Sequence, residues 1–224
     1  HRFVHGGPDC DCPKRVTPAL IARLRRLTAL APLHMPANLA GVEAVHEARP
    51  DLPQVACFDT SFHHDLPRLA RMTALPRTYA EDGVRRYGFH GLSYEYILKT
   101  LRCDGVDTDA ERIIIAHMGN GASMVALRQG QPVETSMGFS TIAGLPMGTR
   151  SGDIDPGILL HLLQNKGMKP DEVADLLYSQ SGLLGISGAS RNMRDLLESH
   201  EEHAAEAVEY FCYQARLHFA RLTG

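Results

Sequence analysis

Two runs of strand-forming residues lie only five residues apart in the middle of the chain. Residues 112–116 are Arg-Ile-Ile-Ile-Ala, and residues 122–128 form a second strand pattern. β-Branched side chains favour strands, and the five residues between the runs are glycine-rich and short enough for a hairpin. Gln129-Gly130 then favours a turn into a third strand. These residues therefore predict two strands joined by a hairpin, with a possible third strand after them.

Helix signals surround these strands. Thr17-Pro18 and Asp155-Pro156 each place a side-chain acceptor directly before a proline, which is the pattern of an N-cap and the first helical residue. Residues 54–58 resemble a further buried strand. Other helices are expected over residues 36–48, 93–101, 170–178, 191–197 and 201–222, with Ser93 and Ser190 as caps. Strands mixed with helices predict an α/β chain.

Composition excludes several classes of protein. The chain has 44% hydrophobic and 22% charged residues and a net charge of -3, which is ordinary for a globular protein and gives no reason to expect nucleic acid or membrane partners. No apolar run approaches the ~18 residues of a transmembrane helix. Five scattered cysteines fit a reduced, cytoplasmic protein better than a disulfide framework. Neither Cys10-Cys12 nor His63-His64-Asp65 has a recognisable set of metal ligands, so no metal-ligating residue is assigned.

The residues His117-Met118-Gly119-Asn120-Gly121 stand between the two central strands. Glycines on either side of Asn120 allow a tight turn that brings backbone N–H groups close to an anion. Such a turn can cradle phosphate, or it can simply close a hairpin. No Walker loop occurs in the sequence.

Two further loops have the composition of anion sites. In residues 148–156, Arg150 stands between two glycines before a helix, where a guanidinium can bind phosphate or carboxylate with two hydrogen bonds. Arg150 could equally pair with Asp153 or Asp155. Residues 187–195 form a glycine-serine loop that opens a helix, and this loop can either bind nucleotide hydroxyls or only cap the helix.

Four polar residues, Arg2, His34, Asp59 and His90, are scattered beside expected strand ends. Taken singly they carry little information, because an isolated histidine is more often structural than catalytic.

In order along the chain, these segments resemble the acetate kinase family over essentially all 224 residues. The matching stretches are HRFVHGG (1–7), APLHMPANLAGVEA (31–44), FDTSFHHDLP (58–67), RRYGFHGLSYEYI (85–97), HMGNGAS (117–123), TSMGF (135–139), GLPMGTRSGDIDP (144–156) and SGLLGISGASRNMRDL (181–196). The resemblance implies an α/β, actin-like (ribonuclease H-like) two-domain ATPase fold that is incomplete at both ends. Residues 1–60 would belong to the N-terminal domain and 61–224 to the C-terminal domain.

The resemblance also implies roles for individual residues. Arg2 and Arg150 resemble the two arginines that grip the carboxylate and the phosphoryl group, and His90 the histidine that hydrogen-bonds the phosphoryl oxygens. Asp59 is similar to an essential positioning aspartate, and His34 to a supporting histidine. The residues similar to the walls of the acetate pocket are Val4, Leu33 and Phe89. Those similar to the nucleotide loops are His117, Gly119, Asn120 and Gly121 at the phosphates and Asn192, Met193 and Arg194 at the adenosine.

The implied activity is reversible, in-line phosphoryl transfer between ATP and acetate, with Mg²⁺, in a cytoplasmic homodimer. Thr141 stands where the family usually has proline, which keeps propionate and other short-chain carboxylates open as substrates. Asn192-Met193 replaces the family's Asp-Phe in the adenosine loop, so nucleotide preference stays open. A sugar kinase and a non-catalytic nucleotide-binding module are the alternatives. Because family segments are missing at both ends, we expect the 224 residues alone to be inactive.

Overall fold

The computed structural model describes residues 1–224, which divide into two compact units. Unit 1 comprises residues 1–115 and 125–141, and unit 2 comprises 116–124 and 142–224. The division passes through β4 (Arg112–Met118) and β5 (Ala122–Arg128), so the turn that joins these strands belongs to unit 2. The predicted boundary near residue 60 concerns the domains of a longer relative and stays a prediction.

A small sheet in unit 1 has the strand order β1-β3-β2. β1 (Arg2–Phe3) runs parallel to β3 (Val55–Phe58), and β2 (Lys14–Arg15) runs antiparallel to it. Phe3 and Phe58 are fully buried, and their ring centroids lie 6.0 Å apart. The helices beside this sheet are α1 (Pro18–Arg26), the 3-10 helix η1 (Leu27–Leu30) and α2 (Met35–Ala48).

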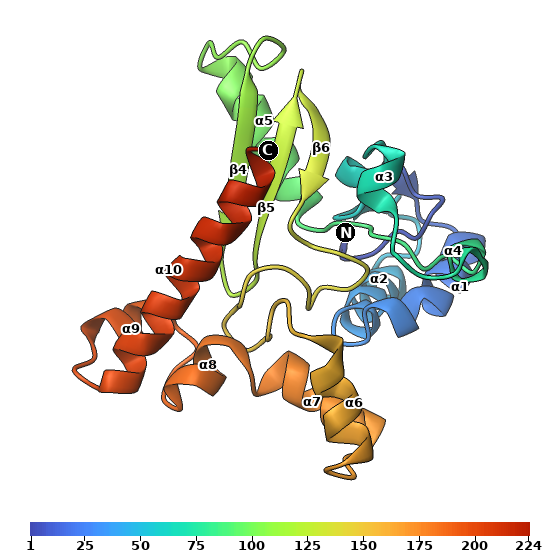
Figure 1. Ribbon diagram of the computed structural model, residues 1–224. Helices are drawn as coiled ribbons and strands as arrows, with labels where there is room; N and C mark the ends of the chain where they lie inside the picture. The colour runs from blue at the N-terminus through green and yellow to red at the C-terminus, as the bar shows by residue number, and fades with distance from the viewer. The chain divides into compact units, whose positions relative to one another are not determined.

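The second sheet has the order β4-β5-β6, with β6 spanning Gln131–Thr135. Helix α5 (Gly91–Cys103) packs on it, as Figure 1 shows. The packed side chains that form this core are Tyr94, Leu98, Ile115, Val125 and Leu127. Gln129 and Gly130 both take positive φ in the two-residue turn before β6, so the predicted turn into a third strand is confirmed.

Short helices lie between β3 and α5 in unit 1. They are η2 (Ser61–His63), α3 (Arg68–Arg71) and α4 (Arg77–Glu81). Arg86, in the segment before α5, forms an ion pair with Glu134 of β6 at 2.8 Å. The connection between β3 and α5 is thereby anchored on the second sheet.

Unit 2 is mainly helical outside the β4–β5 turn. Its helices are α6 (Pro156–Gln164), α7 (Pro170–Ser179), α8 (Gly182–Ser187), α9 (Met193–Glu198) and α10 (Glu202–Leu222). The long helix α10 packs against α8 and α9 (Figure 1). Their shared core contains Leu183, Leu196, Ala204 and Ala207.

The predicted caps of α1 and α6 are confirmed, and two other predicted caps are wrong. The Thr17 side chain accepts the N–H of Leu20, and Asp155 accepts that of Gly157. Helix α5 begins at Gly91 rather than Ser93, and Asn192 rather than Ser190 caps α9. None of the helices combines the length and the apolar character of a membrane-spanning segment.

Candidate active site

The parallel pairing of β1 and β3 brings their carboxyl ends to one edge of the first sheet. The N–H of Asp59 donates to the carbonyl of Phe3 at 2.9 Å, so Asp59 directly follows the last paired residues. In α/β sheets, ligands bind beyond the carboxyl ends of the strands. This edge is therefore the place in unit 1 where a substrate site is expected.

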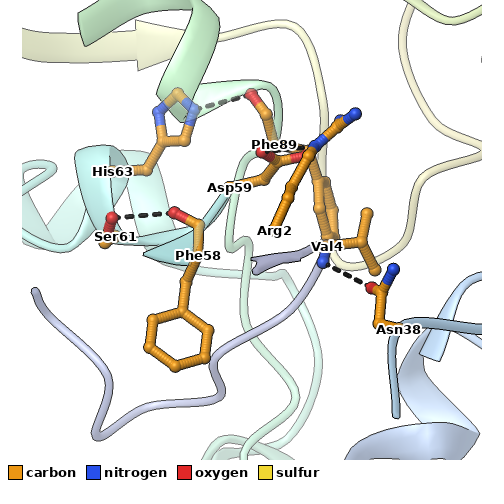
Figure 2. Close-up of polar contacts among 8 residues, drawn as sticks. All are labelled: Arg2, Val4, Asn38, Phe58, Asp59, Ser61, His63 and Phe89. Carbon is orange, nitrogen blue, oxygen red and sulfur yellow. Dashed lines mark hydrogen bonds and ion pairs between the residues drawn. The ribbon is translucent and has the colours of Figure 1, made fainter. Parts of the chain in front are cut away.

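Arg2 and Asp59 form a forked ion pair at this edge (Figure 2). Arg2 Nη2 donates to Asp59 Oδ2 at 2.5 Å, and Arg2 Nε donates to both carboxylate oxygens at 3.1 Å. The Asp59 side chain is only 1% exposed, whereas that of Arg2 is 61% exposed. Hydrogen bonding to Asp59 raises the pKa of Arg2. A buried carboxylate thus fixes a guanidinium that remains open to solvent.

His90 lies beside this pair because the backbone joins them. The N–H of Gly91 donates to the carbonyl of Asp59 at 2.9 Å, which ties the start of α5 to the end of β3. His90 is the N-cap of α5, with φ 59° and ψ 18°, and is buried, as is Phe89. The ends of β1 and β3 and the start of α5 therefore bring together the predicted residues Arg2, Asp59, Phe89 and His90.

Helix α2, whose N-cap is the predicted residue His34, is bonded to the predicted residue Val4 just beyond β1. Asn38 Oδ1 accepts the N–H of Val4 at 3.0 Å (Figure 2), and the N–H of Asn38 donates to the carbonyl of His34. His34 and Asn38 lie one turn apart on the same helix face. Of the residues predicted to form the acetate pocket, Val4 is buried, whereas Leu33 is 53% exposed to solvent.

Four of the seven predicted nucleotide residues meet in unit 2 around a pocket of about 590 Å³. The β4–β5 turn contributes Gly119 and Asn120, and the start of α9 contributes Asn192 and Met193. The other lining residues are Met118, Met147, Gly148, Leu183, Arg191 and Phe211. Two loops about 70 residues apart in the sequence, each predicted to bind nucleotide, thus face one cavity.

Gly148 is what allows these loops to approach. Its N–H donates to the carbonyl of Asn120 at 3.1 Å, and a Cβ at this position would lie 2.4 Å from Asn120 Oδ1 and 3.1 Å from the carbonyl oxygen of Arg191. Sequence reasoning placed Gly148 in an anion loop but did not assign it a role. Its contacts lie 28 and 43 residues away, so no local signal could have revealed them.

The remaining predicted nucleotide residues do not line this pocket. His117 lies in β4, which extends two residues further than predicted, because the turn contains only residues 119–121. Gly121 accepts the N–H of Gly119 across the turn at 2.9 Å. Arg194 is exposed, and its N–H donates to the capping side chain of Asn192 at 3.1 Å.

Arg150 lies in a tightly held loop of unit 2. Its side chain is buried, and this burial lowers its pKa while Tyr178 acts in the opposite direction. Of the carboxylates named as alternative partners, Asp153 accepts the N–H of Gly144, and Asp155 caps α6. A desolvated guanidinium favours an anionic ligand. Arg150 belongs to unit 2, whereas Arg2 and His90 belong to unit 1, so the implied action of these three residues on one substrate stays a prediction.

No group of three or more His, Cys, Asp or Glu side chains gathers to hold a metal ion. The buried thiol of Cys10 instead accepts a hydrogen bond from Arg23 at 2.9 Å. The one carboxylate at the sheet edge, Asp59, is bound by Arg2. The residues of this chain therefore do not fit a metal centre held by protein ligands alone.

Known proteins resemble this chain over nearly its whole length. The family model described as the acetokinase family matches residues 1–223. An acetate kinase from Rhodopseudomonas palustris is 53% identical over 215 residues, which are 96% of this chain and 54% of that protein. One from Nitrobacter hamburgensis is 50% identical over 222 residues, covering 99% of this chain and 55% of that protein. The chain thus spans about half the length of the curated relatives it matches.

Solved structures of an acetate kinase and a propionate kinase are also similar to the chain. The crystal structure of Porphyromonas gingivalis acetate kinase is similar with a TM-score of 0.88 and 40% identity, over 99% of this chain and 57% of that one. A propionate kinase from Francisella tularensis has a TM-score of 0.94 and 35% identity, over 100% of this chain and 59% of that one. The predicted α/β, actin-like fold class is confirmed by these likenesses.

Proposed function

The chain belongs to the acetokinase family, and from this we propose that the protein transfers a phosphoryl group reversibly between ATP and a short-chain carboxylate, acetate first. The observation that supports this most directly is the Arg2–Asp59 pair, which presents an exposed guanidinium at the carboxyl ends of two parallel strands. Arg2 has five N–H donors, of which Nε and one on Nη2 point to Asp59, so the others can bind a carboxylate.

In the proposed reaction a carboxylate oxygen of acetate attacks the γ-phosphorus of ATP in line. The new P–O bond forms as the bond from phosphorus to the bridging oxygen breaks, and ADP leaves with that electron pair. Acetate is already ionised at neutral pH, because carboxyl pKa values lie near 4. No general base is needed, and Asp59 serves to position Arg2.

Charge neutralisation is the main task left to the protein. We assign His90 to the equatorial phosphoryl oxygens and Arg150, with its buried guanidinium, to the same developing charge. His34 would support the phosphoryl group, and Val4, Leu33 and Phe89 would contact the methyl group of acetate. These roles are carried over from the family.

The pocket of unit 2 is proposed to hold the nucleotide. Gly119 and Asn120, which line the pocket, would lie at the phosphates, with His117 and Gly121 next to them in the chain. Asn192 and Met193 would lie at the adenosine, with Arg194 directly after them. Magnesium would arrive bound to the nucleotide phosphates, and no step above depends on a protein-held metal. We also propose that the whole protein is a cytoplasmic homodimer. Its domain boundary would lie near residue 60.

Propionate is the second candidate substrate. It is favoured by the likeness to a propionate kinase structure and by Thr141, a buried residue where the family usually has proline. One methylene changes selectivity in an apolar pocket by only about 10–200-fold, so preference must be measured.

The test uses the intact protein that contains these residues, with ATP and acetate, propionate or butyrate. Hydroxylamine converts an acyl phosphate into a hydroxamate, and we expect hydroxamate with at least acetate. The ratio of kcat/KM values then ranks the substrates. Nucleotide binding in calorimetry without any hydroxamate would instead identify a non-catalytic binding module, and ATP consumption with sugars would identify a sugar kinase.

A further inference from the structure

His90 has a backbone conformation that its local sequence does not explain. It is one of two non-glycine residues with positive φ, at 59°. The other, Gln129, lies in a two-residue hairpin turn that requires positive φ. His90 lies in no hairpin, and the left-handed region costs a non-glycine residue about 1–2 kcal/mol. Its surroundings must hold it there.

The side chain of His63 contacts the peptide group that precedes His90. Its Nε2 lies 2.9 Å from the carbonyl oxygen of Phe89 (Figure 2). The orientation of that peptide group defines φ of His90. A carbonyl oxygen only accepts, so His63 Nε2 carries the proton and donates. Burial lowers the pKa of His63 to about 4, which keeps the ring neutral near pH 7.

Packing fixes the His63 ring in this orientation. Its centroid lies 5.5 Å from that of Phe62 and 5.8 Å from that of Tyr94, both edge-on. On another side, a Cβ at Gly88 would lie 2.6 Å from His63 Cγ, so the chain before His90 lies directly against the ring. His63 is 1% exposed.

An apolar side chain would fill this space at lower cost. The other ring nitrogen, Nδ1, is buried without a hydrogen-bond partner, and such a group lowers stability. The hydrogen bond from Nε2 to Phe89 is thus what distinguishes histidine here from leucine or methionine. The residue on the other side of His90 is held as well, because the N–H of Gly91 donates to the carbonyl of Asp59.

We propose that His63 is a positioning residue: its Nε2–H holds the Phe89 carbonyl and thereby keeps His90 in the left-handed conformation that aims the His90 imidazole at the transferred phosphoryl group. The proposal rests on the proposed function for the role of His90, but not for the conformation of its backbone. His63 itself touches no reacting atom.

Three substitutions test the hydrogen bond. In His63→Gln the side-chain amide reaches the position of Nε2, in His63→Asn it reaches only that of Nδ1, and in His63→Met no donor remains. In the intact protein we expect Asn and Met to lower kcat by roughly 10- to 100-fold, as misplacement of a reacting group does. The KM for acetate should change much less, and Gln should restore most of kcat.

A measurement independent of activity accompanies the kinetics. Hydrogen exchange of the Gly91 amide, followed by NMR, reports whether the backbone around His90 stays in place. We expect faster exchange in the Asn and Met variants than in the wild type and the Gln variant. If wild-type protein makes no acyl phosphate, the proposed function fails while this comparison still tests the positioning. If Met does not fold, Gln against Asn decides.

Wild-type kcat in a folded Asn or Met variant would overturn the proposal. So would equal Gly91 exchange in all variants, or a Gln variant as slow as Asn, since either result would reduce His63 to a packing residue.

Discussion

At the scale of single residues, Arg2 and Asp59 differ in their access to water. Asp59 is 1% exposed at the side chain, and Arg2 is 61% exposed. A buried carboxylate that loses its partner remains costly, whereas an exposed guanidinium is solvated without one. The two halves of this ion pair should therefore respond differently to substitution.

We predict that Arg2→Met destabilises the protein by about 1–3 kcal/mol, because it leaves the Asp59 carboxylate buried without its cation. The double variant Arg2→Met/Asp59→Asn should recover much of this loss, since it removes the charge. Urea denaturation of the wild type, both single variants and the double variant gives the coupling energy. Strictly additive effects would show that the pair contributes nothing.

The same residue scale shows what sequence can reveal. Arg2, Asp59 and His90 were predicted from motifs, and the structure brings them together at one sheet edge. Asn38 and His63 were not predicted as site residues. Each acts by bonding a backbone group 34 or 26 positions away. No pattern local to either residue reflects such a contact, and His63 was considered only as a metal ligand.

At the scale of elements, prediction was accurate where the signal was local. Thr17-Pro18 and Asp155-Pro156 start helices as expected, because cap and proline act within one turn. Helix α5 starts two residues before Ser93, because the N–H of Gly91 is satisfied by the distant carbonyl of Asp59. A tertiary hydrogen bond replaces the side-chain cap.

Two glycines in helices should therefore behave in opposite ways. At Gly91 a Cβ would lie 2.3 Å from the carbonyl oxygen of Asp59, so Gly91→Ala should destabilise by about 1–3 kcal/mol, as overpacking does. At Gly41, inside α2, nothing lies within 4 Å, so Gly41→Ala should stabilise by about 0.5–1 kcal/mol. Chemical denaturation of both variants is the measurement, and destabilisation of the same size in both would contradict it.

The β4–β5 turn and the loop at Gly148 form a second close contact between elements. Gly148→Ala would push Asn120 and the backbone at Arg191 apart, which should weaken nucleotide binding about 10-fold, or ~1.4 kcal/mol. Calorimetric titration with ATP measures this. The control is Gly41→Ala, in unit 1, which should leave the ATP affinity unchanged. A substitution at Gly188 would not serve as a control, because Gly188 has positive φ. Unaltered ATP affinity in Gly148→Ala would remove this pocket from the proposal.

At the scale of the whole molecule, burial of histidines links stability to pH. His5 and His63, both in unit 1, are almost fully buried, and desolvation lowers the pKa of each to about 4. His5 Nδ1 accepts the N–H of Gly7, and its ring packs against Tyr87 and Phe89. In unit 2, burial also lowers the pKa of His218. The folded chain thus resists protonation that the unfolded chain accepts.

Between pH 6.5 and about 4 the unfolded state binds more protons than the folded state, so stability must fall as pH falls through this window. Each such histidine contributes a slope of about 1.4 kcal/mol per pH unit where the unfolded form is protonated and the folded form is not. We predict that in a His5→Phe/His63→Gln variant the slope of the unfolding free energy against pH is smaller than in the wild type by the contributions of these two histidines. Urea denaturation of both proteins at pH 7, 6, 5 and 4.5 measures the slopes. The slope that remains in the variant should come from His218, which is unchanged. An identical slope in both proteins would mean that these two rings are protonated in the native state, and so that their burial is less complete than the structure shows.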